Sequence, residues 1–149
     1  MADPATPETP PVSILHATCV AVAGRGLLIT GASGRGKSAL ALQMMGLGAA
    51  LVADDRVELR RTGNALTASA PPAIGGLIEA RGLGLLRADP AGPTPVFALL
   101  DLDRDEPDRL PQARKIDLLG QSVTLLFRVD APHFAAALVQ FLKTGQRTL

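Results

Sequence analysis

The residues best suited to chemistry form one short segment, residues 31–38, with the sequence GASGRGKS. It fits the phosphate-loop pattern G-x-x-x-x-G-K-[ST], and its members are Gly31, Ala32, Ser33, Gly34, Arg35, Gly36, Lys37 and Ser38. Its glycines allow a tight turn in which successive backbone N–H groups point at a polyphosphate. An apolar run over 26–30 precedes the segment, and good helix formers follow over 39–45. The pattern therefore predicts a strand, an anion-binding loop and a helix whose first turn faces the same anion.

Two side chains of this segment extend the prediction to a nucleotide with a metal ion. Lys37 would supply a positive charge to the β- and γ-phosphates, and Ser38 would supply a hydroxyl to Mg²⁺. ATP and Mg²⁺ are therefore the expected cofactors. The structural alternative is a glycine-rich turn between a strand and a helix that contains a lysine by chance.

A pair of carboxylates forms the second candidate group. Asp54 and Asp55 follow the apolar run 49–53, which predicts a short buried strand. Open α/β sheets bind ligands beyond the ends of such strands, so one carboxylate would lie near the metal and the other would accept a proton from an attacking hydroxyl. Glu79 is a further candidate metal ligand. Turn-forming aspartates and a solvated loop glutamate are the alternatives.

The remaining pattern predicts the elements that hold these residues in place. An apolar stretch over 12–23 predicts a strand that carries His16 and turns back at 24–26 beside the strand of the loop. A hairpin is expected over 56–61 and 65–70, further strands over 96–102, 115–119 and 123–129, and an amphipathic helix over 132–144. A charged loop is expected over 103–114.

A glycine-dense segment over 74–86 fits none of these classes. It holds four glycines around Glu79 and Arg81, too many for a regular helix, and it is too apolar for a solvated linker. We expect the backbone of this segment to lie close to another group. We also expect the segment to complete the site only when an acceptor docks. A tight, core-packed crossing of strands is the alternative.

Composition bounds the class of protein. At 149 residues and 47% hydrophobic content the chain fits one domain over 12–149, behind a disordered leader over 1–11 that contains four prolines. A net charge of +1 and only four aromatic residues, all Phe, argue against a nucleic-acid partner. The single Cys19 fits a buried position in a reducing compartment. We expect a cytoplasmic protein without a membrane span, because no signal peptide or long apolar run is present.

In order and spacing, four of these features closely resemble the catalytic domain of the HPr kinase/phosphorylase family. They are His16, the loop 31–38, the segment LVADDRV over 51–57, and the segment GLIEARGLG over 76–84. The resemblance covers about 13–109 and implies an α/β P-loop fold like that of phosphoenolpyruvate carboxykinase, with a mixed sheet, the loop helix and a C-terminal helix. It implies an ATP-dependent kinase for a serine of an HPr-type phosphocarrier protein, working as a homo-oligomer, by family a hexamer.

The resemblance also implies roles for single residues. Asp55 corresponds to the acid/base residue of the family, Lys37 to its phosphate-binding lysine, and His16 to its active-site histidine. Ser38 and Glu79 correspond to its metal positions, while Asp54 remains our own candidate for the metal side. Arg109 is the match for its catalytic arginine.

Two departures from the family pattern modify these expectations. The chain resembles the short Gram-negative forms that lack an additional N-terminal domain, and residues 127–132 lack the arginine- and glycine-bearing segment linked to dephosphorylation, with only Arg128 alignable. The phosphorylase activity is therefore open. The rival functions are a small-molecule kinase with the same loop and a non-catalytic ATP-sensing module.

Overall fold

The computed structural model describes residues 12–148, so the predicted leader over 1–11 lies outside the described residues. In chain order the elements are β1 (Val12–Leu15), β2 (Thr18–Val22), β3 (Arg25–Thr30), α1 (Lys37–Gly46), β4 (Ala50–Ala53), β5 (Val57–Thr62), β6 (Ala65–Ser69), the 3₁₀ helix η1 (Pro72–Ile74), β7 (Leu77–Ala80), β8 (Gly84–Arg87), β9 (Thr94–Asp105), β10 (Lys115–Leu118), β11 (Gln121–Arg128) and α2 (Phe134–Thr144). Of the helices in this part of the chain, none has the length and apolar character needed to cross a membrane.

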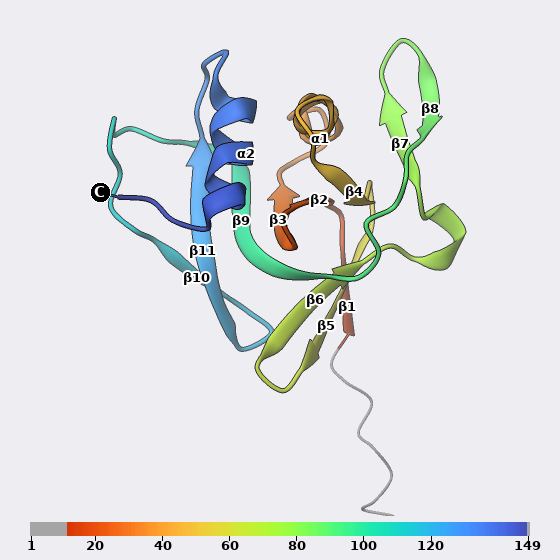
Figure 1. Cartoon of the computed structure of the whole chain (residues 1–149), viewed down its shortest axis with the longest axis horizontal. Coiled ribbons are helices and arrows are strands. Elements are labelled where there is room, and N and C mark those ends of the chain that lie inside the picture. Colours follow the sequence, from red (N-terminus) through yellow and green to blue (C-terminus); the bar gives the residue numbers. More distant parts are fainter. Residues whose placement is uncertain (1–11, 149) are drawn as a thin grey trace, which may run out of the picture.

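Nine strands within the described residues form one mixed sheet. Its order is β1-β5-β6-β9-β3-β2-β4, with β11 on the other edge of β9 and β10 on β11. The three strands β3, β9 and β11 run parallel to one another, and the other pairings are antiparallel. The hairpin β7–β8 forms a separate two-stranded sheet that stands apart from the main one (Figure 1). The predicted α/β class, mixed sheet and C-terminal helix are confirmed.

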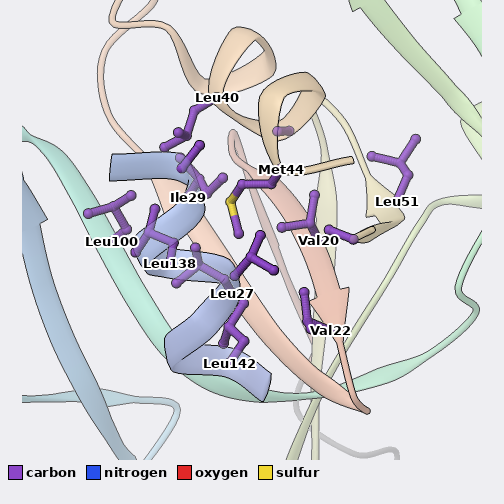
Figure 2. Close-up of a cluster of buried hydrophobic side chains, with 14 of the residues drawn as sticks. Val20, Val22, Leu27, Ile29, Leu40, Met44, Leu51, Leu100, Leu138 and Leu142 are labelled. Atoms are coloured by element: carbon purple, nitrogen blue, oxygen red, sulfur yellow. The ribbon is translucent and has the colours of Figure 1, made fainter. Parts of the chain in front are cut away.

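The central strands bury both faces, which explains their nearly continuous apolar sequences. On one face Val20, Leu27 and Ile29 pack against Met44 of α1 and Leu138 of α2 (Figure 2). Both helices therefore cover the same side of the sheet. This packing fixes α1, and with it the loop that precedes α1, against β3.

The opposite face is covered by the sheet itself. Cys19 and Leu28 of the central strands pack with Leu59 and Leu66 of the β5–β6 hairpin. Burial raises the pKa of the Cys19 thiol to about 12, so it behaves as a small neutral core residue, as predicted. The two helices on one face and the β5–β6 hairpin on the other therefore bury the central strands on both sides.

Three sequence predictions about elements need correction. The stretch 12–23 is two strands, because the chain bends at His16 so that β1 can pair with β5 while β2 pairs with β3 and β4. The segment 74–86 contains a regular hairpin, because its glycines lie before β7, in the turn and at the start of β8. Strand β9 continues to Asp105, beyond the predicted end at 102.

The charged loop after β9 is held by one carboxylate. Glu106 accepts hydrogen bonds from both Nη1 and Nη2 of Arg114, at 2.5 and 3.2 Å, and from the Asp108 N–H at 3.1 Å. The Arg114 guanidinium lies 4.3 Å from the ring centroid of Phe127 on β11. The Arg114 hydrogen bonds hold the pKa of Glu106 below its ordinary value. The ionised carboxylate therefore stabilises the closed loop.

We expect Glu106→Gln to lower stability at neutral pH, measured as the urea midpoint. Because the pKa of Glu106 is lowered in the folded protein from its ordinary value of 4.5, its contribution is present above that pH and is lost as the pH falls below it. The difference between variant and wild type should therefore shrink on acidification. Asp130→Asn, whose carboxylate is 86% exposed, is the control. A difference that does not change with pH would contradict this assignment.

Candidate active site

The loop predicted to bind an anion lies where the sequence placed it, between β3 and α1. Gly34 and Gly36 have φ angles of 86° and 94°, a region that favours glycine, so the turn depends on these residues. Gly36 is the N-cap of α1 and has no side chain over the helix end, and the first turn carries no acidic residue. The N–H groups at this helix N-terminus therefore remain available to an anion.

The ammonium group of Lys37 lies over the loop. Lys37 is only 8% exposed, and its Nζ donates hydrogen bonds to the carbonyl oxygens of Gly31 at 2.8 Å and Ala32 at 3.3 Å. These two carbonyls are neutral acceptors, so a phosphate oxygen would offer the ammonium a stronger partner at the same place. The loop and Lys37 together fit a polyphosphate.

A pocket of about 480 Å³ opens beside this loop. Its lining brings together residues from the β1–β2 bend, the loop, α1, the end of β4 and the β7–β8 hairpin. The sequence-predicted members are His16, Ser33, Gly34, Gly36, Lys37, Ser38, Asp55 and Glu79. Arg81, named with Glu79 in the glycine-dense segment, also lines it, and the other lining residues are Thr18, Ala39, Leu42 and Ala80. The pocket thus joins segments that lie more than 60 residues apart in the sequence.

Asp54 lies behind the pocket, 6% exposed, and connects three of its walls. Its Oδ1 accepts hydrogen bonds from Ser38 Oγ at 2.7 Å and Thr18 Oγ1 at 2.8 Å, and its Oδ2 accepts one from the Glu79 N–H at 3.0 Å. Three donors satisfy the buried carboxylate, so it can remain in the interior. Asp54 therefore fixes α1, β2 and β7 relative to one another.

Asp55 has the opposite environment from its neighbour. Its side chain is 60% exposed, and Oδ1 lies 3.3 Å from His16 Nδ1. Its φ angle is 71°, a left-handed conformation that Asp tolerates better than most residues. Asp54 is thus buried as a structural partner, while Asp55 faces the pocket, where its carboxylate can accept a proton.

The site fits a magnesium ion that takes most of its ligands from a nucleotide. Within residues 12–148 no three His, Cys, Asp or Glu side chains lie close enough to hold a metal by themselves. Ser38 Oγ donates its hydrogen bond to Asp54, so the lone pairs of Ser38 Oγ remain available. The Glu79 carboxylate lines the same pocket. Mg²⁺ commonly combines one or two protein oxygens with phosphate oxygens and water, as this donor set would allow.

Besides Asp54, several predicted residues do not line the pocket, namely Gly31, Ala32 and Arg35 of the loop and the distant Arg109, and two contributors had been missed. Arg109 is exposed in the loop after β9 and does not line the pocket. Thr18 and Asp103 were not singled out, although Thr18 donates to Asp54 and Asp103 accepts the Ala32 N–H. Thr18 could have been found as the one polar residue at the start of an apolar strand. For Asp103 the only sequence signal was its position after an apolar run.

Comparison with known proteins relates these segments to one family. The family model described as the HPr Serine kinase C-terminal domain matches residues 8–90, more than half of this chain. An HPr kinase/phosphorylase of an Exiguobacterium species is 46% identical over 80 residues, and that of Bordetella avium is 48% identical over 77 residues. The alignments cover 53% and 51% of this chain. They cover 26% and 25% of those proteins, so the chain spans about a quarter of the length of the curated relatives it matches.

A solved structure extends the similarity beyond the matched segment. The Hpr(Ser) kinase/phosphatase from Coxiella burnetii matches this chain with a TM-score of 0.75. The match covers 89% of this chain and 90% of the Coxiella chain. The two are 22% identical, so this likeness bears on the fold alone. The α/β architecture described above is therefore shared with that protein over nearly the whole chain.

We expect Asp54→Asn to destabilise the protein by about 1–3 kcal/mol, because an amide turns a donor toward at least one of the three donors that the carboxylate satisfies. Urea unfolding at neutral pH measures this. Asp55→Asn is the matched control, and because that side chain is exposed its effect should stay within about 0.5 kcal/mol. Equal stability of the two variants would show that Asp54 does not hold the walls together.

Proposed function

Because this chain belongs to the HPr serine kinase C-terminal domain family, we propose that it is an ATP-dependent protein serine kinase acting on an HPr-type phosphocarrier protein of a phosphotransferase system. The observation that carries the proposal is the convergence of three separate segments of the matched region on one pocket. The bend at His16, the loop with Lys37 and Ser38, and the hairpin with Glu79 meet there beside Asp55.

The loop end of the pocket would bind the nucleotide. The loop N–H groups and the α1 N-terminus would hold the phosphates of ATP, and Lys37 would exchange its two carbonyl partners for phosphate oxygens. Ser38 and Glu79 would hold Mg²⁺, which supplies charge neutralisation on the phosphates. Asp54 would act through Ser38, since it accepts the hydrogen bond from the Ser38 hydroxyl and leaves the lone pairs of that oxygen for the metal.

Asp55 would accept the proton of the attacking serine. The seryl oxygen forms a bond to the γ-phosphorus, the bond from that phosphorus to the bridging oxygen breaks, and ADP leaves. His16 Nδ1, 3.3 Å from the carboxylate, would orient Asp55. Most of the rate would come from positioning and from charge stabilisation rather than from covalent chemistry with the protein. A contribution from Arg109 stays a prediction, as does a reverse phosphorylase reaction.

The β7–β8 hairpin would form the wall that meets the acceptor protein. Glu79, Ala80 and Arg81 line the pocket, while Leu83 and Leu85 are 76% and 70% exposed at and beside the turn. The regular pairing of the hairpin in the chain alone favours a preformed wall over a segment that becomes ordered only when the acceptor docks. A cytoplasmic location and a homo-oligomeric, hexameric assembly remain predictions from the family.

The proposed function is tested by incubating the chain with labelled ATP, Mg²⁺ and each HPr-type protein encoded by the same genome. We expect transfer to one such protein, and Asp55→Asn should lower it by about 10²–10⁴-fold, because an amide cannot accept the serine proton. ATP affinity should change little in this variant. Transfer to metabolites without a protein acceptor, or ATP binding without any transfer, would instead support the two rival functions.

We expect Lys37→Ala to weaken Mg-ATP binding, because it removes a charge-assisted contact worth roughly 1.5–3 kcal/mol. Isothermal titration calorimetry gives the dissociation constant directly. Lys115→Ala, an exposed lysine on β10 that does not line the pocket, is the control for loss of one positive charge. An unchanged constant in Lys37→Ala would mean that its ammonium does not face the phosphates.

A further inference from the structure

The phosphate loop is held by a carboxylate at each end. At its C-terminal end Asp54 accepts the hydrogen bond from Ser38. At its N-terminal end the N–H of Ala32 donates to both carboxylate oxygens of Asp103, at 3.1 Å each. Asp103 lies on β9, which pairs in parallel with β3, so the contact ties the start of the loop to the neighbouring strand.

A residue of the loop itself lies against this carboxylate. Arg35 Nε is 3.3 Å from Asp103 Oδ1, and the guanidinium also donates to the Leu102 carbonyl, through Nη2 at 2.9 Å and Nε at 3.3 Å. The two charged side chains are about half exposed, 43% for Arg35 and 49% for Asp103. Arg35 therefore bridges the middle of the loop to the end of β9.

This arrangement creates an electrostatic conflict that Arg35 resolves. Asp103 holds the loop by the kind of backbone N–H contact that an anion makes, but its negative charge beside the loop repels a polyphosphate. A paired guanidinium cancels that charge at close range. Without Arg35, the Asp103 carboxylate that positions the loop would weaken polyphosphate binding to that loop by charge repulsion.

We propose that Arg35 and Asp103 are a positioning pair for nucleotide binding. Asp103 fixes the start of the loop through Ala32, and Arg35 neutralises Asp103 so that the loop still accepts phosphates. The inference rests on the nucleotide-binding part of the proposed function and is independent of the acceptor protein. It gives a role to the variable position that directly precedes Gly36 in the phosphate-loop pattern.

A double-mutant cycle measured with a fluorescent ATP analogue and Mg²⁺ tests the pair. We expect Arg35→Gln to weaken binding by roughly 10-fold, the size of effect that one nearby unit charge exerts on a polyphosphate at a partly exposed site. Asp103→Asn keeps an oxygen for the Ala32 N–H and should bind as well as wild type or slightly better. The double variant should recover most of the affinity lost in Arg35→Gln.

Two further measurements separate charge from shape. Arg35→Lys keeps the charge but loses the planar contact with the Leu102 carbonyl, and it should stay within about 2-fold of wild type. The loss in Arg35→Gln should shrink as salt rises, because the repulsion is screened. Arg60→Gln, which removes an arginine paired with Glu58 on β5, is the matched control and should not change binding.

The outcomes distinguish this inference from the proposed function. If wild type binds no nucleotide, the proposed function fails. If wild type binds but Asp103→Asn does not rescue Arg35→Gln, or Arg35→Lys loses as much affinity as Arg35→Gln, the pair acts through loop shape and the inference is wrong. If nucleotide binding follows the cycle but no HPr-type protein is phosphorylated, the inference stands and the assigned acceptor is wrong.

Discussion

The candidate site depends on one buried carboxylate. Asp54 accepts hydrogen bonds from β2, from the first turn of α1 and from the backbone of β7. A buried ionised group is costly unless it is fully paired, so this position tolerates only an arrangement in which all three donors converge. The same constraint sets the distance between the phosphate loop and the hairpin, and hence the width of the pocket between them. Asp55 can then stay exposed and free for chemistry, because its neighbour carries the structural role.

The parts of this site that depend on residues close together in the sequence could be predicted from the sequence. The loop, the helix after it and the Asp54-Asp55 pair were found because glycine spacing, helix propensity and a polar pair after an apolar run are short-range signals. The C-terminal helix was found because its apolar residues recur with helical spacing and Gly145, with φ of 70°, ends it. The mixed sheet was expected only from the family resemblance, and its strand order was not predicted, since pairing partners are chosen by tertiary packing.

Features set by distant partners were predicted less well. The stretch around His16 is apolar on both sides, and only the pairing of β1 with β5 shows why the chain bends there. Asp103 lies 71 residues from Ala32, and an acceptor for one backbone N–H leaves no pattern in the sequence. The glycines of the 74–86 segment were interpreted as a sign of a backbone held close to another group, and the hairpin in which they occupy the turn and ends was not predicted. In each case the missing information was a contact between elements.

The separation of the β7–β8 hairpin from the main sheet has an evolutionary consequence. One side of the hairpin is fixed, since Ile78 is buried in the core beside α1 and the Glu79 N–H bonds to Asp54. The outward residues Leu83, Leu85 and Arg87 are exposed and lie outside the core clusters. Substitutions there can accumulate at little cost to folding or to the phosphate loop. Under the proposed function, descendants of one ancestral protein could thus diverge in the acceptor they recognise while inheriting the same phosphate loop.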